Sequence, residues 1–262
     1  MNLAIETKGL VRRFGEFAAV DGIDLKVERG TLFGFLGPNG AGKSTTIKML
    51  TGLMGATSGK AYVLGRDIAK DPVEVKRRIG VVPEELALFD RLTGPEYLEF
   101  CGRMYGLSTD QIPKRTDELL GLMGLQEDRE KLILDYSHGM QKKLAISAAL
   151  LHGPDLVFLD EPFEGVDAIS SRLIKDLLHS LLEKGVTVFL TSHILEIVEG
   201  LCTDLAIIHK GRLVAEGSLD ELRAGIEFKG GNGDGGKMTL EQVFLSLVGG
   251  TPTERATLSW LE

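Results

Sequence analysis

Short apolar runs alternate with polar and glycine-containing turns at the start of the chain. Runs at 3–7, 23–27 and 31–36 have the length and composition of β-strands, and the turns between them favour a small antiparallel sheet that leads into the run at 31–36. The third run meets a glycine-rich turn and then the helical pattern of 43–52. A strand, a turn and a helix in immediate succession are typical of α/β proteins.

A regular alternation of strands and helices continues along much of the chain. Such alternation predicts a parallel sheet with helices on both faces. Near the end, a turn at 210–212 joins runs that predict an antiparallel strand pair, 206–209 and 213–216. The predicted strands are 60–64, 79–82, 156–159, 186–191 and 205–208, and the predicted helices are 72–78, 137–151, 170–184 and 194–201.

One part of the chain breaks this alternation. Residues 93–130 lack strand-like runs and carry apolar positions at helical spacing. We therefore predict a helical subdomain, inserted at about 93–150, within one domain that covers 1–228. Residues 229–262 are predicted to form a glycine-rich linker followed by an amphipathic helix.

The overall composition restricts the classes of partner. The 262 residues include 38 Asp and Glu against 30 Lys and Arg, a net charge of −8. This charge argues against nucleic acid as a partner, because such binding depends on clustered basic residues. The N-terminus lacks the apolar core of a signal peptide, and no uncharged stretch reaches the ~18 residues of a membrane-spanning helix. The two cysteines, Cys101 and Cys202, have no metal-binding spacing and fit a reducing compartment.

The motif with the clearest chemistry lies between the strand at 31–36 and the helix at 43–52. Its glycines let the backbone turn tightly and point N–H groups inward, and the helix N-terminus adds partial positive charge. Lys43 is placed to reach the β- and γ-phosphates of a nucleotide, and the Ser44 hydroxyl to coordinate Mg²⁺. The sequence therefore predicts ATP or GTP binding by Gly37, Pro38, Asn39, Gly40, Ala41, Gly42, Lys43, Ser44 and Thr45.

Two carboxylates follow the apolar strand at 156–159. Asp160 and Glu161 would lie at the carboxyl end of a parallel strand, where open α/β sheets bind ligands. Asp160 is a candidate ligand of Mg²⁺, and Glu161 is a candidate general base for an attacking water. The alternative is an acidic strand end without a function. The phosphate-binding loop at 37–44, called the P-loop below, makes this alternative the weaker one.

Three further residues are candidates for the same site. His193 follows the strand at 186–191, within reach of the γ-phosphate if that strand neighbours the P-loop strand. Phe14 could stack on adenine, and Glu84 follows the strand at 79–82 and could face the metal. Each has an ordinary alternative: a structural histidine, a core phenylalanine and a solvated loop glutamate.

Taken together, these motifs resemble those of the ATP-binding cassette (ABC) ATPases, and the resemblance covers residues 3–220 in order. The family's Walker A motif corresponds to 37–44, and its Walker B strand to 156–160 with Glu161 after it. The Leu-Ser-Gly-Gly-Gln signature corresponds to 136–140, where Ser137 and Gly139 are kept. The segment 164–167 resembles the D-loop. His193, Phe14 and Glu84 correspond to the switch histidine, the A-loop aromatic and the Q-loop residue.

Four residues depart from the family's pattern: Tyr136, His138, Met140 and Glu84. The Glu84 carboxylate keeps the acceptor oxygens of the usual glutamine and adds a charge that suits Mg²⁺. The His138 ring either faces the phosphate or turns into a neighbouring pocket. Hydrolysis is compatible with these departures.

The resemblance implies the fold and the roles of the site residues. The fold is a P-loop NTPase core with a parallel sheet, an N-terminal antiparallel β subdomain and the inserted helical subdomain. ATP and Mg²⁺ are the implied cofactors. Lys43, Glu161 and His193 are the implied catalytic residues, and Ser44, Glu84 and Asp160 the implied metal ligands. Two cassettes would pair head to tail, so that Ser137 and Gly139 of one cup the γ-phosphate bound to the other.

A transporter subunit is the function that this resemblance favours. We expect a peripheral ATPase at the cytoplasmic face of the membrane that pairs with a second ATPase subunit, as a homodimer or with a sister chain. It would drive a separate integral membrane permease. Residues 84–93 and 240–245 resemble export-type subunits of the drug, antibiotic or polysaccharide classes. Leu86, Leu88, Phe89 and Tyr97 are candidate permease contacts, and packing within the helical subdomain explains them equally well.

Two other classes are less consistent with the sequence. A soluble ABC ATPase that acts on ribosomes or DNA would usually show two cassettes, a basic arm or a long coiled coil. A P-loop kinase or GTPase would lack the signature-like segment 137–140 and His193.

Overall fold

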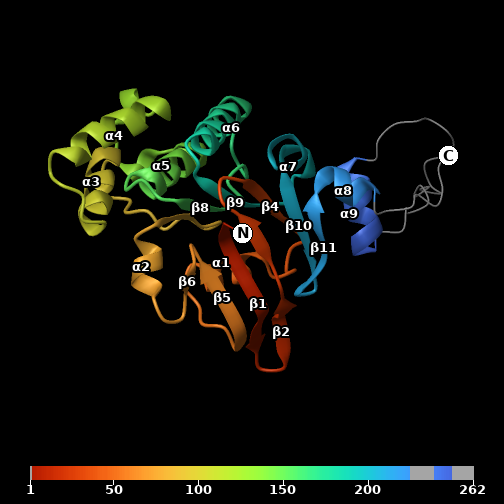
Figure 1. Ribbon diagram of the computed structural model, residues 1–262. Coiled ribbons are helices and arrows are strands. Elements are labelled where there is room, and N and C mark those ends of the chain that lie inside the picture. The colour runs from red at the N-terminus through yellow and green to blue at the C-terminus, as the bar shows by residue number, and fades with distance from the viewer. Residues whose placement is uncertain (1, 225–238, 250–262) are drawn as a thin grey trace, which may run out of the picture.

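Two β-sheets and a group of helices make up residues 2–224 and 239–249, the part of the chain that the computed structural model describes (Figure 1). The first sheet has five strands and is antiparallel, in the order β2-β1-β5-β6 with β3 also paired to β1. Its strands are β1 (Leu3–Phe14), β2 (Phe17–Ile23), β3 (Lys26–Glu28), β5 (Ser58–Val63) and β6 (Arg66–Asp67).

The second sheet has six strands in the order β11-β10-β4-β9-β8-β7. Strands β10 to β7 run parallel, and β11 forms an antiparallel edge. Every residue of β4, β8 and β9 is buried, as expected for parallel strands that are covered on both faces. The strands are β4 (Leu32–Leu36), β7 (Ile79–Val82), β8 (Leu156–Asp160), β9 (Thr187–Ser192), β10 (Asp204–His209) and β11 (Arg212–Ser218).

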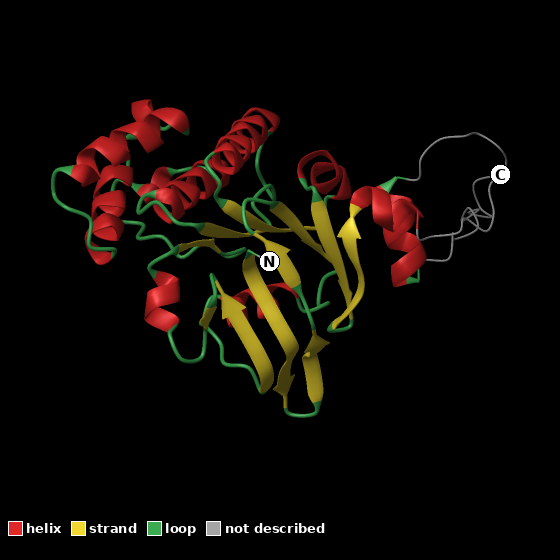
Figure 2. Ribbon diagram, viewed as in Figure 1, coloured by secondary structure: helices red, strands yellow, loops and turns green. Residues whose placement is uncertain are grey.

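The helices cover the parallel sheet from one side and fill the space beneath it on the other. Helices α5, α6 and α7 lie above the parallel sheet, and α1 lies between the two sheets (Figure 2). Helices α3 and α4 pack on α5 at one end of the molecule. The helices up to residue 201 are α1 (Lys43–Leu50), α2 (Pro72–Lys76), α3 (Gly94–Met104), α4 (Gln111–Leu122), α5 (His138–Leu150), α6 (Ala168–Glu183) and α7 (Leu195–Leu201).

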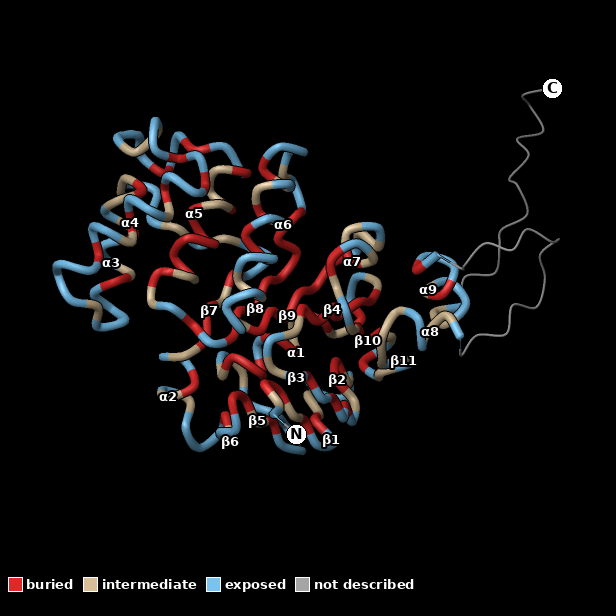
Figure 3. Tube along the Cα trace, turned by 45° about the horizontal axis from the view of Figure 1, so that its top comes forward, coloured by how far each residue is buried: buried red, intermediate tan, exposed pale blue. Residues whose placement is uncertain are grey.

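Two main apolar clusters follow from these layers. One lies between the antiparallel sheet, α1 and the lower face of the parallel sheet, with Phe35, Phe158 and Phe189 at its centre. The other joins the upper face of the parallel sheet to the helices. Figure 3 shows the buried residues concentrated along the central strands. The predicted α/β architecture, with a parallel sheet and an antiparallel N-terminal sheet, is confirmed.

The prediction of a strand at 23–27 is wrong. Strand β2 ends at Ile23, and β3 begins at Lys26. Two side-chain hydrogen bonds interrupt the strand: Gly9 N–H donates to Asp24 Oδ1 (2.7 Å), and Leu25 N–H donates to Thr7 Oγ1 (2.9 Å). The sequence analysis also missed most of β2, which pairs with the second half of β1 through the tight turn after Phe14.

The C-terminal helix packs on the core. The predicted linker at 229–237 lies outside the described residues, but α9 (Leu240–Val248) is described and begins at a capping box formed by Thr239 and Gln242. Leu240 and Val243 are buried in a third apolar cluster, which includes residues of α7, α8 (Leu219–Ala224) and β10. No helix within residues 2–224 and 239–249 is long and apolar enough to cross a membrane.

Candidate functional site

The loop that joins β4 to α1 forms one wall of the site. At two of its glycines, a side chain would collide with the backbone of a neighbouring strand. A Cβ on Gly37 would lie 2.4 Å from the Ile208 carbonyl oxygen. A Cβ on Gly42 would lie 2.4 Å from the Ala19 carbonyl oxygen, and Gly42 has a φ of +110°. The loop can therefore press against β2 and β10 while its backbone wraps around the start of α1.

A cavity of about 570 Å³ opens above this loop. Its size is within the range of small-molecule sites, roughly 300–1,000 Å³. It collects residues that lie far apart in the sequence, from the P-loop, the first hairpin, the loop after β7 and the ends of β8 and β9. The lining residues are Phe14, Phe17, Ala19, Pro38, Asn39, Gly40, Ala41, Gly42, Lys43, Ser44, Thr45, Glu84, Glu161, Glu164 and His193.

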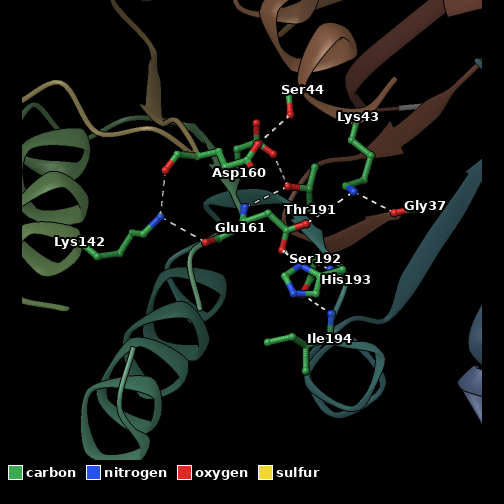
Figure 4. Close-up of polar contacts among 11 residues, drawn as sticks. Gly37, Lys43, Ser44, Lys142, Asp160, Glu161, Thr191, Ser192, His193 and Ile194 are labelled. Carbon is green, nitrogen blue, oxygen red and sulfur yellow. Dashed lines mark hydrogen bonds and ion pairs between the residues drawn. The ribbon is translucent and has the colours of Figure 1, made fainter. Parts of the chain in front are cut away.

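Lys43, Glu161 and His193 meet at the floor of the cavity (Figure 4). Lys43 Nζ donates to the Gly37 carbonyl oxygen at 2.8 Å and lies 3.6 Å from Glu161 Oε1. Glu161 Oε2 accepts from the His193 backbone N–H at 3.2 Å and lies 2.9 Å from His193 Nδ1. Glu161 is buried, with 4% of its surface exposed, and no hydrogen-bond partner reaches Oε1 within the described part of the chain.

Pairing of β8 with β9 explains how these groups come together. Asp160 lies opposite Thr191 in the parallel ladder, and Thr191 Oγ1 donates to Asp160 Oδ1 at 2.5 Å. The same hydroxyl accepts from the Glu161 backbone N–H at 3.0 Å. Glu161 has a φ of +50°, a left-handed conformation that costs a non-glycine residue of the order of 1–3 kcal/mol. Such strain persists when neighbouring contacts hold it, and here it turns the carboxylate toward Lys43.

The three predicted metal ligands present oxygen atoms toward one another. Ser44 Oγ donates to Glu84 Oε2 at 3.4 Å, and Asp160 lies beside them at the end of β8. The described residues contain no cluster of three or more His, Cys, Asp or Glu that could hold a metal without other ligands. Mg²⁺ needs no such cluster, since it binds through one or two carboxylates together with phosphate oxygens and waters. This donor set therefore fits Mg²⁺ bound together with a nucleotide.

Two aromatic residues stand at the mouth of the cavity. Phe14 ends β1 and is 46% exposed, and Phe17 begins β2 and is 63% exposed. The guanidinium of Arg12 lies over the Phe14 ring, 4.7 Å from its centroid. Phe14 is therefore not a core residue, and Arg12 already covers one part of its exposed ring.

The structure places Ser137 and Gly139 elsewhere. Neither lines the cavity. Ser137 caps α5, where its hydroxyl accepts from the Met140 N–H at 3.3 Å, and its side chain is exposed. His138 turns its ring against Gly165, since a Cβ on Gly165 would lie 2.7 Å from the His138 Cδ2 atom. Within one chain, the signature-like segment and the P-loop do not form one site.

Two residues that hold the backbone of Glu161 were not predicted from the sequence. Thr191 is a polar residue near the end of the buried strand β9, and its position beside Asp160 follows once the strand order is known. Lys142 is buried in α5 and contacts the backbone of Glu84 and Glu161. No signal in the sequence distinguishes it from the adjacent Lys143, which is partly exposed.

Comparison with known proteins agrees with this geometry. The model of the family described as ABC transporter matches residues 20–164. The chain is 42% identical over 223 residues to the daunorubicin/doxorubicin resistance ATP-binding protein DrrA of Streptomyces peucetius, covering 85% of this chain and 68% of that protein. It is 36% identical to the probable multidrug ABC transporter ATP-binding protein YbhF of Escherichia coli (strain K12), covering 93% of this chain and 41% of that protein. A solved structure described as the ATP-binding subunit of an ABC transporter superposes with a TM-score of 0.85 at 31% identity, covering 93% of this chain and 99% of that chain.

Proposed function

The chain belongs to the ABC transporter family, and we propose that it binds and hydrolyses ATP to drive a separate membrane permease that exports small molecules. The observation that carries the proposal is the meeting of Lys43, Glu161 and His193 beside the P-loop in one cavity. The names of DrrA and YbhF, which concern drug resistance and multidrug transport, support the export of drug-like compounds.

Each part of the site has a role in hydrolysis. The P-loop amides and Lys43 bind the phosphates, because the start of α1 and an ammonium group both favour anionic oxygens. Glu161 accepts a proton from the attacking water through Oε1, the oxygen that lacks a hydrogen-bond partner in the described part of the chain. His193 holds Oε2 of the same carboxylate and so fixes its direction. Mg²⁺ on Ser44, Asp160 and Glu84 would neutralise charge on the β- and γ-phosphate oxygens.

The position of Ser137 and Gly139 supports a composite site. Their segment lies at the start of α5, outside the cavity of its own chain; Ser137 is exposed there, and Gly139 is buried in the first turn of the helix. A second copy, paired head to tail, would bring this segment to the γ-phosphate from the open side. ATP would then join the two chains, and hydrolysis would release them.

Mixing of inactive variants tests the composite site. A Lys43→Ala chain keeps an intact signature-like segment, and a Ser137→Ala chain keeps an intact P-loop. Mixed dimers of the two would contain one intact site each, so ATPase activity should recover to about a quarter of the wild-type value. Lys43→Ala mixed with Glu161→Gln is the matched control, because both residues belong to the same half of the site and no intact site can form. Recovery in the control as well, or in neither mixture, contradicts the composite site.

An exposed aromatic patch supports the permease as partner. Phe89 is 49% exposed and makes edge contacts with Tyr97 and with Phe100, which is 42% exposed. Leu86 and Leu88 are partly buried against the helical region, so internal packing accounts for these two. The patch follows directly on Glu84, and a permease that docks there at the cytoplasmic face of the membrane would sense the state of the site.

Purification from the native membrane tests this assignment. The full chain should copurify with an integral membrane protein, and its ATPase activity should depend on that protein. Recovery with ribosomes or DNA instead would favour a soluble ABC ATPase. A preference for GTP over ATP would favour a GTPase.

A further inference from the structure

Lys142 is a buried cation that the proposed mechanism does not use. It lies early in α5, and 1% of its surface is exposed. Its Nζ donates to the backbone carbonyl oxygen of Glu161 at 3.2 Å and to that of Glu84 at 3.5 Å. Figure 4 shows the side chain reaching from the helix toward both oxygens.

A buried ammonium group needs an explanation, because removing a charge from water is costly unless it is well paired. Burial lowers the pKa of Lys142, and the carboxylates of Glu164, Asp160, Glu161 and Glu84 act in the opposite direction. An apolar side chain of similar length would fill the same space without this cost. What Lys142 adds to the position is therefore its two hydrogen bonds.

The bond to Glu161 acts on the strained part of the site. Glu161 has a φ of +50°, and its N–H is held by Thr191 Oγ1 at 3.0 Å. Lys142 holds the carbonyl oxygen of the same residue. The backbone of Glu161 is thus fixed on both sides, and its carboxylate stays directed at Lys43 and His193.

The second bond extends this control to the predicted metal ligand. The Glu84 side chain lies 3.4 Å from Ser44 Oγ, while its carbonyl oxygen is held by Lys142. A single ammonium group therefore sets the spacing between the loops that carry Glu84 and Glu161. Lys142 belongs to α5, the helix that Ser137 caps. A movement of α5 would therefore displace both loops.

We propose that Lys142 is a positioning residue for ATP hydrolysis, which orients the Glu161 carboxylate and the Glu84 loop relative to the phosphates. This inference rests on the proposed function. Lys142 touches neither nucleotide nor water in the mechanism; it acts through Glu161 and Glu84.

The first test separates turnover from binding. Lys142→Met keeps the length of the side chain and removes the donor. We expect kcat to fall ~10- to 100-fold, since displacement of a reacting group by about 1 Å costs up to that factor. The Kd for ATP should stay within about twofold, because the P-loop contacts are unchanged. Lys143→Met, at the next and partly exposed position of α5, is the matched control and should keep wild-type kcat.

The second test asks whether Lys142 acts through Glu161. In a Glu161→Gln background, Lys142→Met should cause little further loss in single-turnover hydrolysis, because the group it positions is already disabled. Lys142→Gln, which keeps an N–H donor, should hydrolyse ATP several-fold faster than Lys142→Met. If Lys142→Met does not fold, Lys142→Gln is compared with Lys143→Gln; this variant keeps a shorter donor, so we expect a smaller fall in kcat, confined to Lys142→Gln.

A kcat of Lys142→Met equal to that of Lys143→Met would overturn the inference. Losses that multiply in the Glu161→Gln background would overturn the part of it in which Lys142 acts through Glu161. Both leave the proposed function intact. That function fails separately, if the wild-type chain with its permease does not hydrolyse ATP or if Glu161→Gln turns over at the wild-type rate.

Discussion

A methyl group added at Gly42 should destabilise the protein far more than one added at Gly40. Both glycines have positive φ values, +110° and +76°. An alanine at either position therefore pays roughly 1–2 kcal/mol for the left-handed conformation. At Gly40 no atom lies within 4 Å of the added Cβ, whereas at Gly42 the Ala19 carbonyl oxygen would lie at 2.4 Å.

The difference in stability between the two variants depends on which atoms must move to make room for the Cβ at residue 42. The clash is with the backbone carbonyl oxygen of Ala19 in β2, which cannot rotate away as a flexible side chain would. The neighbouring backbone is also held: Gly211 N–H donates to the Ala41 carbonyl oxygen at 2.9 Å, and Asp21 N–H donates to the Gly211 carbonyl oxygen at 2.8 Å. Overpacking of this kind typically costs ~1–3 kcal/mol beyond the conformational strain.

Urea unfolding of the two variants measures this difference. Gly42→Ala should be less stable than Gly40→Ala by about 1–3 kcal/mol, which corresponds to a Tm lower by roughly 2–4 °C for each kcal/mol. Gly42→Ala should also bind ATP more weakly, since relief of the clash displaces the amides at the start of α1. Equal free energies of unfolding for the two variants would refute the argument that the P-loop is pressed against β2.

Three substitutions test the roles of single side chains. Glu161→Gln should keep its affinity for ATP and lose ~10²–10⁴-fold in kcat, the usual contribution of a general base; unchanged turnover in a steady-state assay would reject its role. Lys43→Ala should abolish the ATP binding that calorimetry measures, because it removes the ammonium group that lies 2.8 Å from the Gly37 carbonyl oxygen. Retained affinity for ATP would reject the assignment of the P-loop. Phe14→Ala should weaken ATP binding by ~1–3 kcal/mol if the ring stacks on adenine, with Phe17→Ala as the matched control on the same rim; an equal or larger loss for Phe17→Ala would identify Phe17 as the stacking residue.

The elements that were predicted well are those whose sequence pattern has one physical explanation. The strand at 79–82 matches β7 because four apolar residues end at a proline. The helix predicted to begin at residue 137 matches α5 because Ser137 is a strong capping residue. The prediction of a strand at 23–27 failed because Asp24 accepts from a backbone N–H of β1 and the Leu25 N–H donates to a side chain of β1, at least 15 residues away in the sequence.

The same distinction applies to the site. The P-loop and the pair Asp160–Glu161 are continuous in sequence, so their chemistry could be predicted from residue type and spacing. Their approach to His193 depends on β4, β9 and β8 being neighbours in the sheet. The alternating pattern predicted a parallel sheet, but it did not predict the order of the strands. Thr191 and Lys142 act on the backbone of Glu161, and no sequence motif records a contact of that type.

The contacts of Lys43 suggest how ATP prepares the site for its own hydrolysis. Lys43 Nζ lies 3.6 Å from Glu161 Oε1, so the γ-phosphate that we expect Lys43 to bind competes with this carboxylate for the same ammonium group. Oε2 stays beside the backbone N–H and the ring Nδ1 of His193, and Lys142 and Thr191 hold the backbone of Glu161. We therefore expect the carboxylate to keep its direction when Lys43 turns to the phosphate. Oε1 then becomes available to a water molecule beside the phosphate, in the position that a general base requires. With these proposed roles for Lys43 and Glu161, we expect phosphate binding at Lys43 to release the Glu161 base in the same step.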